Sequence, residues 1–100
     1  MISAENSKNL FFEKLASRQK KLDSLLCVGL DPDIKRIPSS KLLNPEPIFA
    51  FNKAIVDATS DLTACYKLQI AHYASEAAED QLEKTILYIK DKGIPVILDA

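Results

Sequence analysis

LTACYKLQIA, at residues 62–71, is a short and largely apolar run that is a candidate β-strand. Two similar runs lie on either side of it in the chain, LLCVGL at residues 25–30 and IPVILDA at residues 94–100. Apolar side chains recur at helical spacing between these runs, over residues 45–61 and 75–92. Strand and helix therefore alternate, and this order predicts an α/β fold with about three parallel strands and intervening helices.

Local signals mark the ends of the predicted elements. A further helix is expected over residues 5–20, where apolar side chains again recur near helical spacing. Residues 31–47 hold four of the five prolines and are expected to be mostly loop. Ser75 is expected to cap the start of the last helix, and Gly93 to end that helix with a left-handed turn. These signals do not distinguish the start of a barrel from a doubly wound sheet.

Composition and charge argue against several classes of function. The chain has 13 basic and 14 acidic residues and a net charge of −1, so nothing draws it toward nucleic acid or an anionic membrane. No run approaches the roughly 20 apolar residues of a membrane span, and the first residues lack a secretory signal pattern. Cys27 and Cys65 stand alone in apolar surroundings, so we expect buried, reduced thiols in a cytoplasmic protein.

Each predicted strand carries a charged residue at or near its carboxyl end. Because strand side chains alternate between faces, Asp31, Lys67 and Asp99 are expected on matching faces of three neighbouring strands. Ligands bind at this edge of parallel sheets and barrels, and a buried charge is costly unless it is paired. The pattern therefore predicts that the three side chains meet and that Lys67 and Asp99 neutralise each other. The alternative is that each charge simply reaches solvent.

Other kinds of site have little support. The only glycines are Gly29 and Gly93, so neither a dinucleotide-binding nor a P-loop pattern is present. His72 is the only histidine and has no cysteine or histidine at metal-binding spacing, so no metal site is expected. A lone histidine of this kind is more often a surface or packing residue than a catalytic base.

Three stretches together resemble a known family: LLCVGLDPDIKRIP at residues 25–38, FNKAIVDATSDLTACYKLQIAHY at residues 51–73, and LEKTILYIKDKGIPVILDA at residues 82–100. They resemble, in order and spacing, the N-terminal part of orotidine-5'-phosphate decarboxylases. The likeness is to the branch with a long first loop, some members of which are fused to orotate phosphoribosyltransferase. The resemblance implies a TIM (β/α)8 barrel, of which residues 1–100 are an incomplete domain that ends at the third strand.

The resemblance also implies roles for the three strand-end residues. Asp31 matches the aspartate that hydrogen-bonds the nucleotide's ribose, and Lys67 matches the second-strand lysine of the charged catalytic network. Asp99 matches the aspartate that opens the third-strand signature Asp-Ala-Lys-Arg-Gly-Asp. The lysine of that signature, which protonates C6, falls after Ala100. The implied reaction is the conversion of orotidine 5'-phosphate to UMP in de novo pyrimidine biosynthesis, without metal or organic cofactor.

Further expectations follow from this likeness. The full-length parent would be a homodimer in which a partner aspartate completes each site, with a possible fused or associated orotate phosphoribosyltransferase. The 100 residues alone are expected to be inactive. The chain departs from the family at Leu68, where proline is usual, and over residues 72–80, where the family often has aromatic residues and a glycine.

Two rival interpretations remain open on the sequence. Another phosphosugar-using barrel lyase or aldolase would use Lys67 as a Schiff-base nucleophile. A non-catalytic truncated remnant would serve only as a binding or assembly piece.

Overall fold

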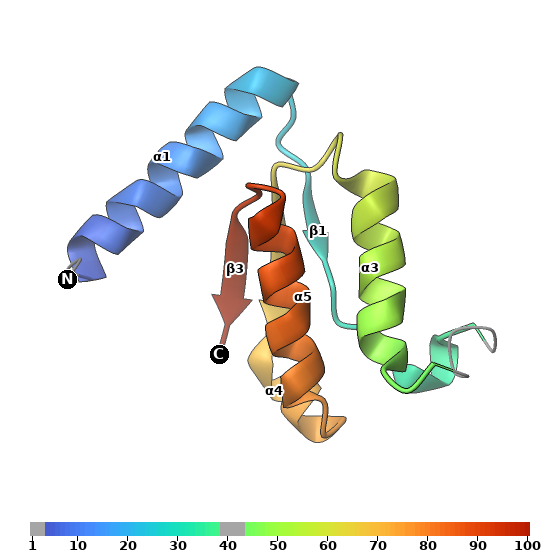
Figure 1. Ribbon diagram of the computed structural model, residues 1–100. Coiled ribbons are helices and arrows are strands. Elements are labelled where there is room, and N and C mark those ends of the chain that lie inside the picture. The colour runs from blue at the N-terminus through green and yellow to red at the C-terminus, as the bar shows by residue number, and fades with distance from the viewer. Residues whose placement is uncertain (1–3, 39–43) are drawn as a thin grey trace.

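The computed structural model describes residues 4–38 and 44–100, in which helices and strands alternate (Figure 1). In chain order the elements are α1 (Ala4–Leu22), β1 (Cys27–Gly29), the 3-10 turn η1 (Ile34–Arg36), α3 (Pro47–Thr59), β2 (Cys65–Gln69), α4 (Ile70–Ser75), α5 (Glu79–Asp91) and β3 (Val96–Asp99). The three predicted strands and the three predicted helices are all present, and α4 is an addition to them.

The three strands form one parallel sheet in the order β1-β2-β3, so β2 lies in the middle. Gly29 of β1 lies opposite Lys67 of β2, and Gln69 of β2 lies opposite Asp99 of β3. Sequential parallel strands joined by helices confirm the predicted α/β class. The shared direction of the strands also brings all their carboxyl ends to one edge of the sheet.

The core lies between the sheet and the helices that cover one of its faces. Figure 1 shows α3 and α5 side by side over this face. Tyr66 and Leu68 of β2 are fully buried there, because alternate side chains of a strand point to the same face. Burial of a leucine side chain stabilises a fold by roughly 1.5–3 kcal/mol. The helices supply further buried apolar residues, which include Ile48, Val56, Leu82 and Ile89.

The first helix extends away from the sheet (Figure 1) and is fastened near its C-terminal end. The guanidinium of Arg18 donates hydrogen bonds to the carbonyl oxygens of Ser60, at 2.5 Å, and Thr63, at 2.8 Å. These two residues lie in the turn between α3 and β2, so one side chain ties α1 to the start of the central strand. By contrast, Leu10 and Phe12 on the preceding turns are about half exposed.

The segment after β2 differs from the sequence prediction. Residues 70 and 71 were predicted to extend the strand, but they begin α4 instead. Ser75 does not cap α5: its hydroxyl donates to the carbonyl of His72 within α4, and α5 begins at Glu79 without a side-chain cap. The strand ends at Gln69 because its amide is taken by the carboxylate of Asp31 rather than by a neighbouring strand.

The prediction for Gly93 is confirmed, and that for the thiols is half confirmed. Gly93 has φ of 75° and follows α5, in the left-handed conformation that glycine adopts at low cost. Cys65 is buried, but Cys27 is exposed, contrary to expectation: the two residues lie opposite each other, Cys27 on β1 at the edge of the three-stranded sheet and Cys65 on the central strand β2. Burial, and then the neighbouring thiol of Cys27, raise the pKa of Cys65 to about 12.

This difference predicts unequal reactivity of the two thiols in the 100-residue chain. At pH 8 a thiol with a pKa of about 12 is a thiolate in only ~10⁻⁴ of molecules, and the thiolate is the nucleophile. We expect N-ethylmaleimide to modify Cys27 at least ~100-fold faster than Cys65, as measured by peptide mass spectrometry. Cys27→Ser should abolish the fast phase, whereas equal rates at both positions would contradict the structure.

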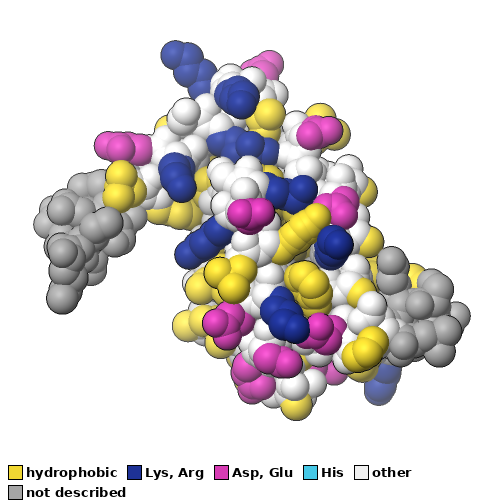
Figure 2. Space-filling view, in the orientation of Figure 1, with side chains coloured by type: hydrophobic (Ala, Val, Ile, Leu, Met, Phe, Trp, Pro, Cys, Tyr) yellow, Lys and Arg dark blue, Asp and Glu magenta, His cyan; other side chains and the backbone are white. Residues whose placement is uncertain are grey.

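The outer face formed by α3 and α5 carries mixed charge. Figure 2 shows acidic and basic side chains interspersed there, which agrees with the net charge of −1. Tyr88 donates a hydrogen bond to Asp57 and packs against Phe49, linking the two helices on this surface. Within residues 4–38 and 44–100, no helix has the length and apolar character needed to cross a membrane.

Candidate active site

The structure brings the three predicted site residues to one edge of the sheet. Asp31 follows β1, and Lys67 and Asp99 lie on β2 and β3. The Nζ atom of Lys67 is 3.5 Å from Oδ2 of Asp99, which confirms the predicted pairing of these two charges. Asp99 lies opposite Gln69, which is two residues after Lys67 in β2. The lysine side chain therefore reaches along the sheet toward the carboxyl ends of the strands to meet Asp99.

Asp31 is held in this arrangement by a backbone hydrogen bond. Its Oδ1 atom accepts a hydrogen bond from the amide of Gln69 at 2.8 Å. Gln69 is also the residue opposite Asp99, so both aspartates lie at the same level of the sheet on either side of β2. The amide fixes one carboxylate oxygen, and a carboxylate has a second oxygen that can accept a hydroxyl of a ligand.

The Lys67–Asp99 pair contributes little to the stability of this chain. Each side chain is 50% exposed, and ion pairs with this exposure are worth about 0–1 kcal/mol. Two charges with this exposure would be solvated equally well if each side chain pointed into water on its own. The pair lies at the edge of the sheet where Asp31 also lies, the edge at which parallel sheets and barrels bind ligands.

A second set of contacts, which the sequence did not predict, surrounds the segment after β1. Nε2 of His72 lies 2.6 Å from the carbonyl oxygen of Pro32, and the Tyr73 hydroxyl donates to the carbonyl of Leu30. His72 packs edge-on against Tyr73, which agrees with the expectation that it is a packing residue. The only sequence signal for these contacts was the pair of polar aromatic residues directly after the strand.

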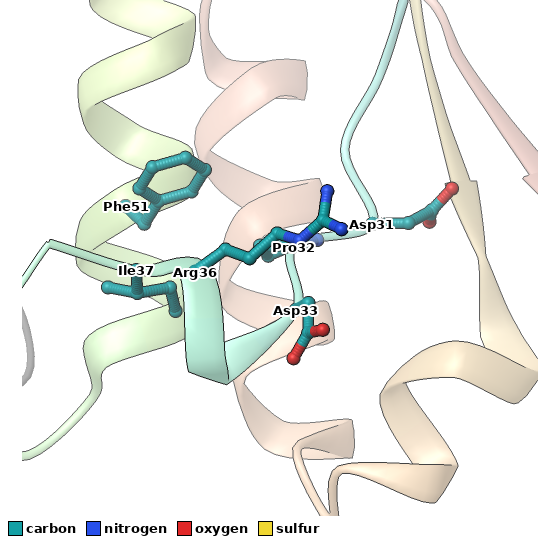
Figure 3. A pocket seen from close by; sticks show the side chains of 6 residues that line it. All are labelled: Asp31, Pro32, Asp33, Arg36, Ile37 and Phe51. Carbon is teal, nitrogen blue, oxygen red and sulfur yellow. The ribbon is translucent and has the colours of Figure 1, made fainter.

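Asp31 also lines a hollow of about 280 Å³ (Figure 3). Its lining comes from the segment after β1, from η1 and from α3, and consists of Asp31, Pro32, Asp33, Arg36, Ile37 and Phe51. In Figure 3 the guanidinium of Arg36 extends across Pro32 toward Asp31. Lys67 and Asp99 do not line this hollow, so Asp31 is the one predicted site residue that belongs to its lining.

The side chains at the strand ends suit electrostatic chemistry. Within residues 4–38 and 44–100, no three His, Cys, Asp or Glu residues cluster as a metal site would require. The group at the strand ends is instead an acid, an ammonium and a second acid. Groups fixed in this way act on charge that develops or departs during a reaction.

Comparison with known proteins finds relatives with a similar sequence and a solved structure with a similar fold. The chain is 54% identical over 94 residues to an "Orotidine 5'-phosphate decarboxylase" of Cellvibrio japonicus, and 55% identical over 92 residues to that of Ralstonia nicotianae. A crystal structure of a "Putative Orotidine-monophosphate-decarboxylase" of Toxoplasma gondii superposes with a TM-score of 0.76 at 37% identity. No family model matches the chain.

These matches cover nearly all of this chain but only part of each relative. They cover 90% of this chain but only 34% of the two bacterial relatives and 30% of the Toxoplasma chain. The chain therefore spans about a third of the length of the proteins it matches. With this match, the three parallel strands and their helices are those of a partial (β/α)8 barrel rather than of a doubly wound sheet.

Proposed function

We propose that this chain forms part of the active site of an orotidine 5'-phosphate decarboxylase, the family to which it is homologous over 90% of its length. The complete protein would convert orotidine 5'-phosphate to UMP in de novo pyrimidine biosynthesis, in the cytoplasm. The observation that carries this proposal is the 3.5 Å pairing of Lys67 with Asp99, beside Asp31, at the carboxyl ends of three adjacent strands.

The proposed reaction breaks the bond between C6 of the pyrimidine and its carboxylate. The electron pair stays on C6 as carbon dioxide leaves, and a proton then replaces the carboxylate. The carbanion has little delocalisation, so it must be stabilised by charges that are fixed before the reaction. A fixed ammonium beside C6 can stabilise the carbanion, and a fixed carboxylate can crowd the departing carboxylate in the ground state.

Each strand-end residue takes one part of this task. Asp31 accepts a hydrogen bond from a ribose hydroxyl through Oδ2, the carboxylate oxygen that the Gln69 amide does not bond. Asp99 lies beside the substrate carboxylate, and Lys67 balances and orients the charges around it. The proton donor to C6, the phosphate site and a homodimer partner lie outside these 100 residues in this proposal.

We therefore expect the 100-residue chain alone to form no UMP from orotidine 5'-phosphate above the background rate. The same residues should work when the rest of a barrel is supplied. In a hybrid enzyme, the matched segment of this chain replaces the aligned 94 residues of the Cellvibrio japonicus relative. Carbon dioxide release and UMP formation are measured for the chain, the hybrid enzyme and the relative.

Activity of the hybrid enzyme together with an inactive isolated chain supports the proposal. Turnover by the isolated chain would refute the division of the site between these residues and the rest of the barrel. A hybrid enzyme that folds like the relative but does not decarboxylate would refute the function itself.

A further inference from the structure

Each of the three residues from Leu30 to Pro32 is held by a hydrogen bond from the same region of the chain. The amide of Gln69 donates to the Asp31 carboxylate at 2.8 Å, His72 bonds the carbonyl of Pro32 at 2.6 Å, and Tyr73 donates to the carbonyl of Leu30. All three partners come from the end of β2 and from α4, the helix that the sequence did not predict. Within the described residues no strand lies beyond this segment, and the three contacts add to the hydrogen bond that the Leu30 amide donates to the carbonyl of Lys67.

The Tyr73 hydroxyl belongs to a buried polar network that crosses the helix layer. Tyr73 and Asn52 are fully buried, and Nδ2 of Asn52 donates to the Tyr73 hydroxyl at 2.9 Å and to Oγ1 of Thr85 at 3.1 Å. Both hydroxyls already donate to backbone carbonyls, Tyr73 to Leu30 and Thr85 to Gln81, so each must accept from Asn52. This assigns the orientation of the Asn52 amide.

This orientation of the Asn52 side-chain amide leaves its oxygen without a partner. In the orientation that serves both hydroxyls, Oδ1 of Asn52 is buried and receives no hydrogen bond from the described residues. A buried polar atom without a partner destabilises a fold, so packing alone would favour an apolar residue here. Burial also raises the pKa of Tyr73, which keeps its hydroxyl protonated as a donor to Leu30.

His72 acts on the same segment from the partly exposed side. A carbonyl oxygen only accepts hydrogen bonds, so the contact with Pro32 requires that Nε2 of His72 carries a proton. The two aromatic residues thus hold the backbone on both sides of Asp31, one at Leu30 and one at Pro32. The carboxylate of Asp31 itself accepts a hydrogen bond from the amide of Gln69, the last residue of β2.

We propose that Tyr73, oriented by Asn52, and His72 are positioning residues that set the carboxylate of Asp31 for its ligand. This inference rests on the proposed function for the identity of the ligand, a ribose hydroxyl of a nucleotide. It assigns a role to residues 72 and 73, where the chain departs from the family pattern. Both residues bond the backbone next to Asp31, so in this proposal they act through Asp31.

The first test uses the 100-residue chain and does not depend on catalysis. Tyr73→Phe removes only the hydroxyl that bonds Leu30, and we expect the amide of Gln69 to exchange with solvent at least ~10-fold faster, as measured by NMR. Tyr88→Phe is the matched control, because it removes the hydroxyl that bonds Asp57 on the outer surface. Equal Gln69 exchange in both variants would overturn the proposal.

The second test uses the hybrid enzyme and separates binding from chemistry. If Asp31 binds the ribose equally in the ground and transition states, Tyr73→Phe raises KM ~5–20-fold and leaves kcat within ~3-fold. His72→Ala should act in the same direction, and His72→Gln, which retains a donor, should recover most of the loss. Tyr88→Phe should leave both constants unchanged.

A double-mutant cycle shows whether Tyr73 acts through Asp31. Once Asp31→Ala has removed the carboxylate, adding Tyr73→Phe should raise KM by less than ~2-fold. Fully additive effects would overturn the proposal and leave Tyr73 as a residue of general stability. If the unmodified hybrid enzyme folds but is inactive, the proposed function fails, while the amide exchange of the 100-residue chain still decides whether the positioning contacts exist.

Discussion

Replacing Lys67 with methionine is expected to lower kcat of the hybrid enzyme by ~10³-fold, with a smaller change in KM. Methionine keeps most of the length of the side chain and removes the ammonium that lies 3.5 Å from Asp99. Loss of one fixed charge that acts on the transition state costs ~10²–10³-fold in rate, and the unpaired carboxylate left behind adds to this loss. Steady-state kinetics of carbon dioxide release measures the effect.

The matched control for this variant is Lys53→Met. Lys53 is an exposed lysine of α3 whose ammonium lies over the ring of Tyr88, on the outer face away from the strand ends. It undergoes the same chemical change and should leave kcat within ~2-fold, because surface substitutions of this kind seldom act beyond their neighbours. If Lys67→Met also stays within that range, Lys67 has no part in catalysis.

The large effect expected at Lys67 depends on enclosure by the rest of the barrel. In this chain the ion pair is half exposed, and water screens charges at such positions. The same pair at the bottom of a closed pocket would act through a lower effective dielectric, where each charge is worth several times more. Identical substitutions in the isolated chain should therefore change its stability by less than ~1 kcal/mol.

The sequence predicted the parallel sheet and its charged edge because both depend on short-range patterns. Apolar runs and helical spacing placed the strands, and the two-residue period of a strand placed Lys67 and Asp99 on one face. The register of the strands then made the pairing possible, since Gln69 lies opposite Asp99. No tertiary information beyond strand order was needed to predict that these charges meet.

What the sequence did not reveal depends on tertiary contacts. Residues 70 and 71 continue an apolar run, and only the bond between Asp31 and the Gln69 amide shows why the strand stops there. The partners of His72 and Tyr73 lie 40 and 43 residues earlier in the chain, beyond the reach of any local pattern. The exposure of Cys27 is likewise a tertiary property, because Cys65, its register partner on the central strand, is buried.

Replacing Asp99 with asparagine should produce a different kinetic signature from that of Lys67→Met. We expect kcat of the hybrid enzyme to fall ~10²–10³-fold and KM to fall as well, by ~5-fold. In the proposed mechanism the Asp99 carboxylate repels the substrate carboxylate, so the neutral amide binds the substrate more tightly and gains nothing on the way to the transition state. A fall in kcat together with a fall in KM is the signature of a variant that has lost strain in the bound ground state.

The direction of the KM change is therefore the decisive measurement. Asparagine has a side chain of the same shape as aspartate, so an increase in KM would mean that Asp99 attracts the substrate or only orients Lys67. Asp61→Asn, at an exposed aspartate after α3, is the matched control and should change neither constant by more than ~2-fold. Direct binding of UMP, which lacks the carboxylate, should be nearly equal in Asp99→Asn and the parent, because the proposed repulsion has no target in the product.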